Sequence, residues 1–367
     1  MKIPFNDLYR IHKPIQKEVL SNFENLVRGN KFVLPESIEI FEKDFAKYTE
    51  SKNTISCSNG TDAIELILRS LDITFGDEVI IPVNTFIATA LAVSRCGATP
   101  IFVDHDEFFL MNVEEIEKKI NHNTKAIIAV NLYGQIANIK KISEISKRNK
   151  LYLIEDAAQS HGAKQENYSV GKFSDAAAYS FYPGKNLGAW GDGGAITTNS
   201  NKIAAKAKLL RNWGSVKKYE HDVIGFNSRL QPVQGFVLSK KLEFLNEYNE
   251  ERQEIANYYL ENLAPIKEIE LPKVFKNNKH VWHLFVIKLK SREYVSAELK
   301  KLGIETIIHY PIPINKQKAY SWHFQAKEKF SNSDKSSKKI LSLPIFPKMK
   351  KTEYQYVVNS IVDVLDR

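Results

Sequence analysis

Cysteine is scarce in this chain of 367 residues, in which only Cys57 and Cys96 occur and no C-x-x-C spacing is found. Two isolated cysteines predict neither a disulfide framework nor a thiolate metal site, so we expect no bound metal and a reducing compartment, the cytoplasm. Long apolar runs are missing as well. The longest, residues 79–93, is interrupted by Pro82 and falls short of the roughly 20 residues that a membrane helix needs. We therefore expect no membrane span, and residues 1–10 indicate no export signal.

Repeats and low-complexity segments are also absent. Hydrophobic residues make up 43% of the chain and charged residues 26%, which is typical of globular proteins. The formal net charge of +9 is spread along the chain, and the lysine-rich residues 316–351 also carry acidic and aromatic side chains. This distribution favours a solvated surface over nucleic-acid binding, and a basic surface also suits anionic small substrates. The length predicts two domains, because domains usually span roughly 100–200 residues.

Residues 59–198 alternate short apolar runs with helical patterns, which is typical of a largely parallel sheet covered by helices. We therefore predict an α/β domain. The predicted strands are residues 78–83, 99–104, 124–131 and 151–156. The predicted helices are residues 60–71, 85–96, 113–120 and 139–150.

The pattern changes after Gln234, where long helical stretches begin. We place a boundary near residue 240, which divides the chain into a large domain of residues 1–240 and a smaller α+β domain of residues 241–367. The large domain includes a helical lead-in, residues 1–50, whose place the pattern does not fix. In the small domain we predict helices at 242–263, at 294–302 and from Glu353, and strands at 282–289 and 305–310.

Polar groups follow several of the strand-like runs, where open α/β sheets bind their ligands. Asn59 and Gly60 form a turn that opens a helix, with Thr61 or Asp62 as the predicted cap. The free N–H groups and the positive dipole end of such a helix suit a phosphate. An ordinary turn before a helix is the alternative interpretation.

A second group follows the strand at 151–156, which ends in Asp156 and leads to Gln159. An aspartate at this place can keep a pyridine nitrogen protonated, which makes the ring an electron sink. A helix cap is the alternative. Phe86, at the end of another predicted strand, can stack on a planar ring or pack in the core.

The third group is Lys185, on a loop shaped by Pro183 and Gly184 after a further apolar run. A lysine that is held away from bulk water has a lowered pKa, and its amine can act as a nucleophile or a base. Most lysines are merely solvated, which is the alternative here.

These groups occur in one chain order: phosphate turn, stacking ring, carboxylate, lysine. Together they resemble the fold-type I pyridoxal-phosphate enzymes, and in particular the nucleotide-sugar aminotransferases of the DegT/StrS family. The resemblance extends over nearly the whole chain and implies an α/β fold of the aspartate-aminotransferase type. It is carried by IPF at residues 3–5, FE at 41–42, NGTDA at 59–63, EDAAQ at 155–159, NSRLQ at 227–231, HYP at 309–311 and LSLP at 341–344.

The resemblance implies a role for each candidate residue. Lys185 is implied to carry pyridoxal 5′-phosphate and to move protons as the catalytic residue. Asp156 is implied to pair with the pyridine nitrogen, Gln159 with the phenolic oxygen, and Phe86 is implied to stack on the ring. The implied phosphate ligands are Gly60, Thr61, Ser180 and, across a homodimer interface, Asn227. The implied substrate contacts are Tyr182, His309 and Tyr310.

The loop around Lys185 resembles the branch of the family that aminates C3 of a keto-sugar. The implied reaction moves an amino group from L-glutamate to C3 of a nucleotide-linked 3-oxo-6-deoxyhexose, with dTDP as the nucleotide, for an O-antigen, an S-layer glycan or another glycan. A UDP-linked 3-oxo-sugar and amination at C4 stay open. The lysine favours transamination over the dehydration that members with histidine at this position carry out.

Two residues depart from the family pattern: Pro35 replaces a glycine, and Asn315 replaces a histidine. The change at Asn315 concerns the substrate contacts. Two other classes of function are weighed as well. A non-catalytic, pyridoxal-phosphate-binding regulator of DNA would not need Lys185, Asp156 and Gln159 together, and the chain shows no helix-turn-helix appendage. A nucleotide-binding dehydrogenase would need a G-x-G-x-x-G turn, which follows none of the predicted strands.

Overall fold

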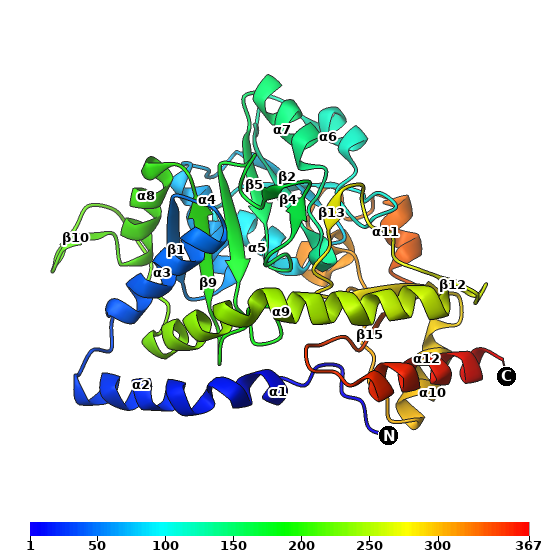
Figure 1. The fold of residues 1–367 in the computed structure, drawn as a ribbon. Helices are drawn as coiled ribbons and strands as arrows, with labels where there is room; N and C mark the ends of the chain where they lie inside the picture. The colour runs from blue at the N-terminus through cyan, green and yellow to red at the C-terminus, as the bar shows by residue number, and fades with distance from the viewer. Residues whose placement is uncertain (367) are drawn as a thin grey trace.

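The computed structural model describes residues 1–366 and is built around a seven-stranded sheet (Figure 1). The strand order is β1-β9-β8-β5-β4-β2-β3, and within this sheet only β9 runs antiparallel to its neighbours. The strands are β1 (Asn53–Cys57), β2 (Glu78–Pro82), β3 (Thr99–Val103), β4 (Thr124–Val130), β5 (Tyr152–Asp156), β8 (Ala176–Ser180) and β9 (Gly194–Thr198). The predicted α/β fold with a mostly parallel central sheet is confirmed.

Helices cover both faces of this sheet. One face packs against α4 (Gly60–Ser70), α5 (Ile87–Arg95) and α8 (Asn201–Arg211). The other packs against α3 (Glu36–Tyr48), α6 (Val113–Lys119), α7 (Ile139–Arg148) and the first part of α9 (Pro232–Leu263).

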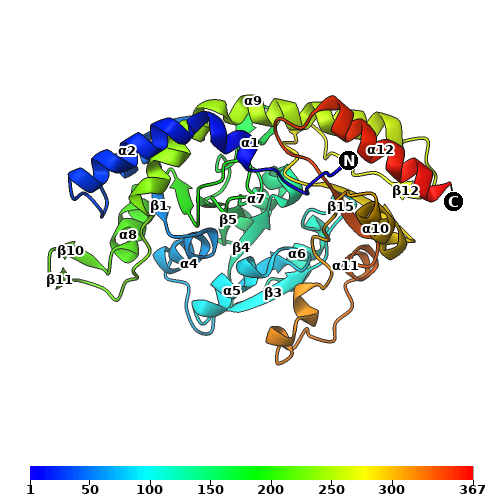
Figure 2. The same ribbon diagram turned by 90° about the horizontal axis from the view of Figure 1, so that it is seen from below.

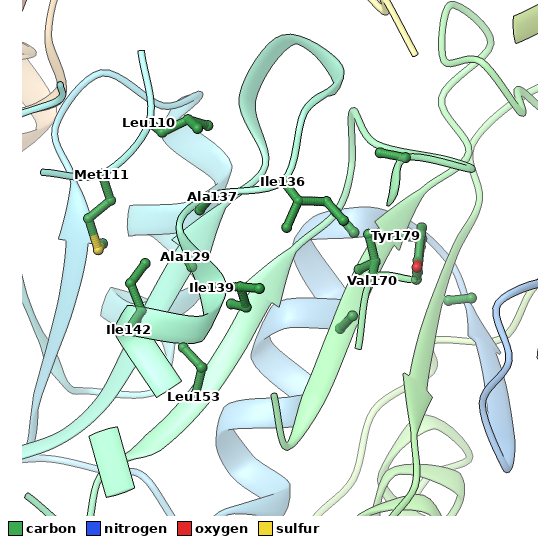
Figure 3. Packing of buried hydrophobic residues seen from close by; sticks show 14 of the residues in the cluster. Leu110, Met111, Ala129, Ile136, Ala137, Ile139, Ile142, Leu153, Val170 and Tyr179 are labelled. Atoms are coloured by element: carbon green, nitrogen blue, oxygen red, sulfur yellow. The ribbon is translucent and has the colours of Figure 1, made fainter. Parts of the chain in front are cut away.

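The strands carry apolar side chains on both faces, because successive residues of a strand point to opposite sides. In β4, Ile127 and Ala129 belong to one buried cluster, and Ala126 and Ile128 belong to the other. Figure 3 shows part of the first cluster, with Ala129 and Ile139 of α7 among its members. This two-sided burial explains why the strands read as continuous apolar runs in the sequence.

The C-terminal part has a separate apolar cluster. This part has an antiparallel sheet of order β12-β14-β15, formed by β12 (Ile269–Glu270), β14 (Phe285–Leu289) and β15 (Ile340–Leu343). Its helices are α10 (Arg292–Lys301), α11 (Ser331–Ser336) and α12 (Lys351–Leu365). Helix α9 runs unbroken across residue 240 and contacts α12, beside which it lies in Figure 2. The domain division at residue 240 stays a prediction, and Arg367 lies outside the described residues.

The lead-in connects the two parts of the molecule. Ile3 pairs with Ile304 of the C-terminal part, and its N–H donates to Gly303 O at 2.8 Å. The chain then forms α1 (Tyr9–His12), the 3-10 turn η1 (Lys13–Ile15) and α2 (Gln16–Arg28). Helix α2 packs against α9 and is followed in the chain by α3. Among residues 1–366, no helix combines the length and the apolar character that crossing a membrane requires.

The smaller elements lie outside the central sheet. Three further 3-10 turns are η2 (Leu132–Gly134), η3 (Ile314–Lys316) and η4 (Lys318–Tyr320). The remaining strands are β6 (Lys164–Gln165), β7 (Tyr168–Ser169), β13 (Asn278–Lys279) and the pair β10 (Ser215–Lys217) and β11 (Glu220–His221).

One predicted element is wrong. Residues 305–310 form no strand, and only Ile307 makes an isolated bridge, to Ser342. The backbone leaves the sheet direction because the carbonyl of His309 accepts a hydrogen bond from the Tyr133 hydroxyl instead of from a neighbouring strand. Pro311 follows directly and provides no N–H for a sheet ladder.

Candidate active site

The predicted site residues converge at one edge of the central sheet. Asp156 ends β5 and Ser180 ends β8, and these two strands are parallel neighbours. Lys185 lies on the loop after β8. Phe86 is the residue before α5 and Gly60 begins α4, and both helices cover the same face of the sheet. The topology therefore collects these residues where parallel sheets bind ligands.

The start of α4 lies against the end of β8. The cap of this helix is Asn59, whose side chain accepts the Asp62 N–H at 2.8 Å, so the prediction of Thr61 or Asp62 as the cap is wrong. The N–H groups of Gly60 and Thr61 come too early in the helix to have an acceptor within it. A Cβ on Gly60 would lie 2.7 Å from the Ser180 Cβ, so the two residues are in close contact. These donors and the Ser180 hydroxyl suit a phosphate.

Asp156 is buried, and both of its carboxylate oxygens accept hydrogen bonds. Thr89 Oγ1 donates to Oδ2 at 2.7 Å, and the Ala158 N–H donates to Oδ1 at 3.1 Å. Burial raises the pKa of Asp156, while these hydrogen bonds and the Lys185 amine act to lower it. Thr89 is absent from the predicted site residues, because a threonine inside an apolar helix gives no sign of a distant partner.

Lys185 is partly buried. Burial lowers the pKa of its amine to about 8, and the Asp156 carboxylate acts in the opposite direction. Its loop is closed by two backbone hydrogen bonds of 2.8 Å, from Lys185 N to Tyr182 O and from Ala189 N to Phe181 O. An amine with this pKa is neutral in a useful fraction near neutral pH, as a nucleophile or base must be.

Gln159, Tyr310 and Phe86 form a second group at the same edge. Gln159 Oε1 accepts the Tyr133 N–H at 2.7 Å, and Gln159 Nε2 donates to the Tyr310 hydroxyl at 3.1 Å. The rings of Phe86 and Tyr310 lie 5.4 Å apart between centroids, and Phe86 is 52% exposed. Burial raises the pKa of Tyr310, so its hydroxyl stays protonated.

The two other predicted substrate contacts differ in exposure. His309 is partly buried, with its Nδ1 2.9 Å from the Ser342 hydroxyl. Burial and, to a lesser degree, the Lys185 charge lower the pKa of His309 to about 4, so the ring is neutral at neutral pH. Tyr182 is 60% exposed and lies at the protein surface.

Asn227 is exposed and lies apart from the buried residues. Its Oδ1 accepts a hydrogen bond from Arg229 Nη2 at 2.6 Å. The next residue, Ser228, is buried, and its hydroxyl lies 2.8 Å from the Ser58 hydroxyl, just before α4. The segment that carries Asn227 is thus fixed beside the phosphate-binding turn, while Asn227 itself faces solvent.

The two departures from the family pattern have local roles. Asn315 is buried, and its Nδ2 donates to the carbonyls of Gln325 and Glu328 at 3.2 and 3.1 Å. This side chain therefore holds the segment 315–328 together. Pro35 has extended backbone and directly precedes α3.

Two histidines near Lys185 are absent from the predicted set. His161 is buried, its ring lies 5.8 Å from the Phe181 ring, and neither of its ring nitrogens has a hydrogen-bond partner within residues 1–366. Burial lowers the pKa of His161 to about 3. His283 Nδ1 lies 3.1 Å from Asn186 Oδ1, and burial lowers its pKa as well. Both rings are neutral, so they add no positive charge beside the lysine.

The chain matches the DegT/DnrJ/EryC1/StrS aminotransferase family over residues 13–362. One relative is the dTDP-3-amino-3,6-dideoxy-alpha-D-galactopyranose transaminase of Aneurinibacillus thermoaerophilus. It is 46% identical over 362 residues, which cover 98% of this chain and 98% of the relative.

Two solved structures are similar along the whole chain. DesV of S. venezuelae is 36% identical with a TM-score of 0.97, covering 100% of this chain and 99% of its own. NtdA of Bacillus subtilis, solved with the cofactor PMP, is 31% identical with a TM-score of 0.94, covering 100% of this chain and 86% of its own.

Proposed function

The chain belongs to the DegT/DnrJ/EryC1/StrS aminotransferase family and is a pyridoxal-phosphate-dependent aminotransferase, and we propose that it transfers the amino group of L-glutamate to C3 of a nucleotide-linked 3-oxo-6-deoxyhexose. The name of the relative from Aneurinibacillus thermoaerophilus supports both the C3 position and the dTDP nucleotide. The product would be a dTDP-linked 3-amino-3,6-dideoxyhexose for a surface polysaccharide or another glycan.

The pairing of Lys185 with Asp156 carries this proposal. A buried carboxylate lies near an amine whose pKa is lowered to about 8. Pyridoxal phosphate needs an amine that can attack its aldehyde and an anion that keeps its ring nitrogen protonated. The residues present therefore fit this cofactor.

The remaining contacts follow from the same arrangement. Gln159 Nε2, which donates to Tyr310, can donate instead to the phenolic oxygen. The open face of Phe86 is free to stack on the ring. The residues that would hold the phosphate are Gly60, Thr61 and Ser180.

When bound, pyridoxal phosphate draws electrons away from the carbon that bears the amino group, which makes the C–H bond of that carbon acidic. Lys185 Nζ would move this proton from the glutamate α-carbon to the cofactor in the first half of the cycle and, in the second half, would move a proton from the cofactor to C3 of the sugar. Asp156 would pair with the ring nitrogen, and the hydroxyl of Thr89 fixes the orientation of its carboxylate.

The sugar would lie on the side formed by Tyr182, His309 and Tyr310. The protonated hydroxyl of Tyr310 can donate to a sugar or pyrophosphate oxygen. His309 is neutral and already bonded at Nδ1, so only Nε2 is available to the substrate. These three residues would hold C3 of the sugar at the reacting centre. The glutamate half-reaction would depend on the buried residues instead.

A homodimer completes the proposal, with Asn227 contacting the phosphate bound in the partner subunit. Figures 1 and 2 both place α2 and the β10-β11 pair at the same end of the molecule. Large apolar side chains are exposed along these segments, and monomers rarely expose so many together. They are Leu20, Phe23, Val27, Phe32, Val33, Trp213, Val216, Tyr219, Val223 and Ile224. Light scattering should find a dimer, and a fully active monomer would exclude a shared site.

The cytoplasm is the proposed compartment. Both Cys57 and Cys96 are buried as free thiols, which suits a reducing environment.

The reaction is tested with ¹⁵N-labelled glutamate and nucleotide-linked keto-sugars generated in situ. A dTDP-linked 3-oxo-6-deoxyhexose should take up the label, and NMR should find it on C3. Label on C4 would contradict the proposed regiochemistry. Preference for a UDP-linked 3-oxo-sugar would contradict the proposed nucleotide. No transfer to any keto-sugar by protein loaded with cofactor would contradict the proposed function.

A further inference from the structure

Three of the almost completely buried polar side chains of helix α9 lie next to the lysine loop: Gln234, Lys241 and Asn249 are 7%, 1% and 5% exposed. They are spaced by about two helical turns, so they lie on one face of the helix. We call these three residues the α9 polar row. Buried polar groups need partners, and each side chain of the row has a partner within residues 186–190. Asn249 also donates to the His161 carbonyl at 2.9 Å, and Lys241 Nζ lies 3.4 Å from His12 Nε2.

The two ends of the α9 polar row bind the two ends of this segment. Gln234 binds both backbone groups of Trp190, accepting from its N–H at 2.8 Å and donating to its carbonyl at 3.3 Å. Asn249 Oδ1 accepts from Asn186 Nδ2 at 2.8 Å. Asn186 directly follows Lys185, so this contact fixes the chain next to the reactive lysine.

The middle member of the row binds the middle of the segment. Lys241 Nζ donates to the Gly188 carbonyl at 2.6 Å. Gly188 has no room for a side chain, since a Cβ would lie 2.2 Å from the Pro183 carbonyl oxygen, so the loop is tightly folded here. Burial, with Arg252 nearby, lowers the pKa of Lys241 to about 7, and within residues 1–366 no carboxylate forms an ion pair with it.

We propose that the α9 polar row is a set of positioning residues, which hold the loop of residues 186–190 so that the Lys185 amine stays beside Asp156. This inference rests on the proposed role of Lys185. In that role the amine must leave the cofactor and return to it in each cycle, and while it is free only the loop backbone fixes its place. Small displacements of a reacting group cost large factors in rate, so a fixed loop matters most in that step.

Hydrogen exchange on the full chain, with and without cofactor, tests the proposal directly. Lys241→Met keeps the length of the side chain but removes the donor, and the amides of residues 185–190 should exchange about tenfold faster, as expected for one lost buried hydrogen bond. Lys241→Gln keeps a donor and should restore part of the protection. The matched control is Lys240→Met, the same substitution one residue earlier in α9, because Lys240 forms ion pairs with Glu18 and Glu243 and its contacts lie away from the loop.

A functional measurement accompanies the exchange experiment. In Lys241→Met the rate constant of the glutamate half-reaction should fall about tenfold while glutamate binding is unchanged, because the loop affects the position of the amine and not the binding site. Gln234→Leu and Asn249→Leu, at the ends of the row, should act in the same direction and serve if Lys241→Met does not fold.

Two results would overturn the proposal: unchanged exchange of residues 185–190 in folded variants of the row, or an equal increase of that exchange in Lys240→Met. Faster exchange without any aminotransfer by the wild-type protein would instead show that the proposed function is wrong while the row still holds the loop.

Discussion

The proposed cofactor side of the site, with Lys185 and Asp156, and the proposed sugar side, with Tyr182, His309 and Tyr310, are built differently. On the cofactor side, Asp156 and Ser180 end buried parallel strands, and Asp156 has a partner for each oxygen. On the sugar side, Tyr182 is exposed, and His309 and Tyr310 lie on a segment without regular structure. We infer from this difference that residues at the ends of buried strands provide the chemistry of the cofactor, whereas residues on irregular segments determine which sugar binds.

The largest effect should come from Lys185→Ala. Turnover should be lost, because no other group can take its place as both nucleophile and base, and general-base catalysis alone is worth about 10²–10⁴ in rate. The fold should survive, because the Lys185 side chain is only partly buried and its loop is closed by hydrogen bonds between backbone groups. Assays of both half-reactions, with circular dichroism as a check of folding, measure this. Normal turnover would mean that another lysine is used.

Asp156→Asn should follow in size. The neutral amide cannot keep a ring nitrogen protonated, so both half-reactions should slow by about 10²–10³, the loss expected for one preorganised charged group. Stopped-flow absorbance measures each half-reaction. A loss confined to the sugar half-reaction would contradict the assignment of Asp156 to the cofactor side.

The cofactor side was largely predictable from the sequence, for a physical reason. Strands buried on both faces need continuous apolar runs, and the polar residue after each run must lie at the carboxyl edge, as Asp156 does. The strands β1 and β9 were not predicted, because β1 includes polar residues and β9 follows a glycine-rich turn. Contacts such as those of Thr89 and Lys241 join residues far apart in the chain, and no local pattern reveals them.

The sugar side shows the limit of this reasoning. The sequence of residues 305–310 predicts a strand, but a tertiary hydrogen bond from Tyr133 to the His309 carbonyl determines the backbone there. The family resemblance implies His309 and Tyr310 of this segment as substrate contacts, and this stays a prediction. Their side-chain contacts came only from the structure.

The pH dependence of cofactor attachment should report on the cofactor side alone. Only the neutral amine attacks the aldehyde, and the pKa of Lys185 is lowered to about 8 by burial. Attachment of pyridoxal phosphate to cofactor-free protein should therefore speed up about 50-fold between pH 6 and pH 8 and only about twofold more above pH 8, where half of the amine is already neutral. A rate that rises steadily to pH 10 would indicate an ordinary, solvated lysine.

His309→Asn and Tyr310→Phe should separate the two sides. Each should slow the sugar half-reaction about tenfold, the cost of one lost hydrogen bond, and leave the glutamate half-reaction almost unchanged. Single-turnover absorbance measurements with each substrate compare them. If the rates of both half-reactions fall equally, these residues support the cofactor or the fold, and the proposed separation of a cofactor side from a sugar side is wrong.

The smallest effect should come from Thr89→Val, which keeps the shape of the side chain and removes the hydrogen bond to Asp156. Both half-reactions should slow by about three- to tenfold, because the carboxylate keeps its charge but loses one of its two partners. The same assays measure this. An effect on the sugar half-reaction only would place Thr89 on the sugar side.

Reduction of the holoprotein with borohydride, followed by peptide mass spectrometry, tests the assignment of Lys185 most directly. Borohydride fixes the cofactor to the amine that carries it. We expect the whole pyridoxyl label on the peptide that contains Lys185, with the loss of the visible absorbance matching the label. A label on any other lysine, including the buried Lys241, or protein that takes up no cofactor after reconstitution, would contradict the assignment.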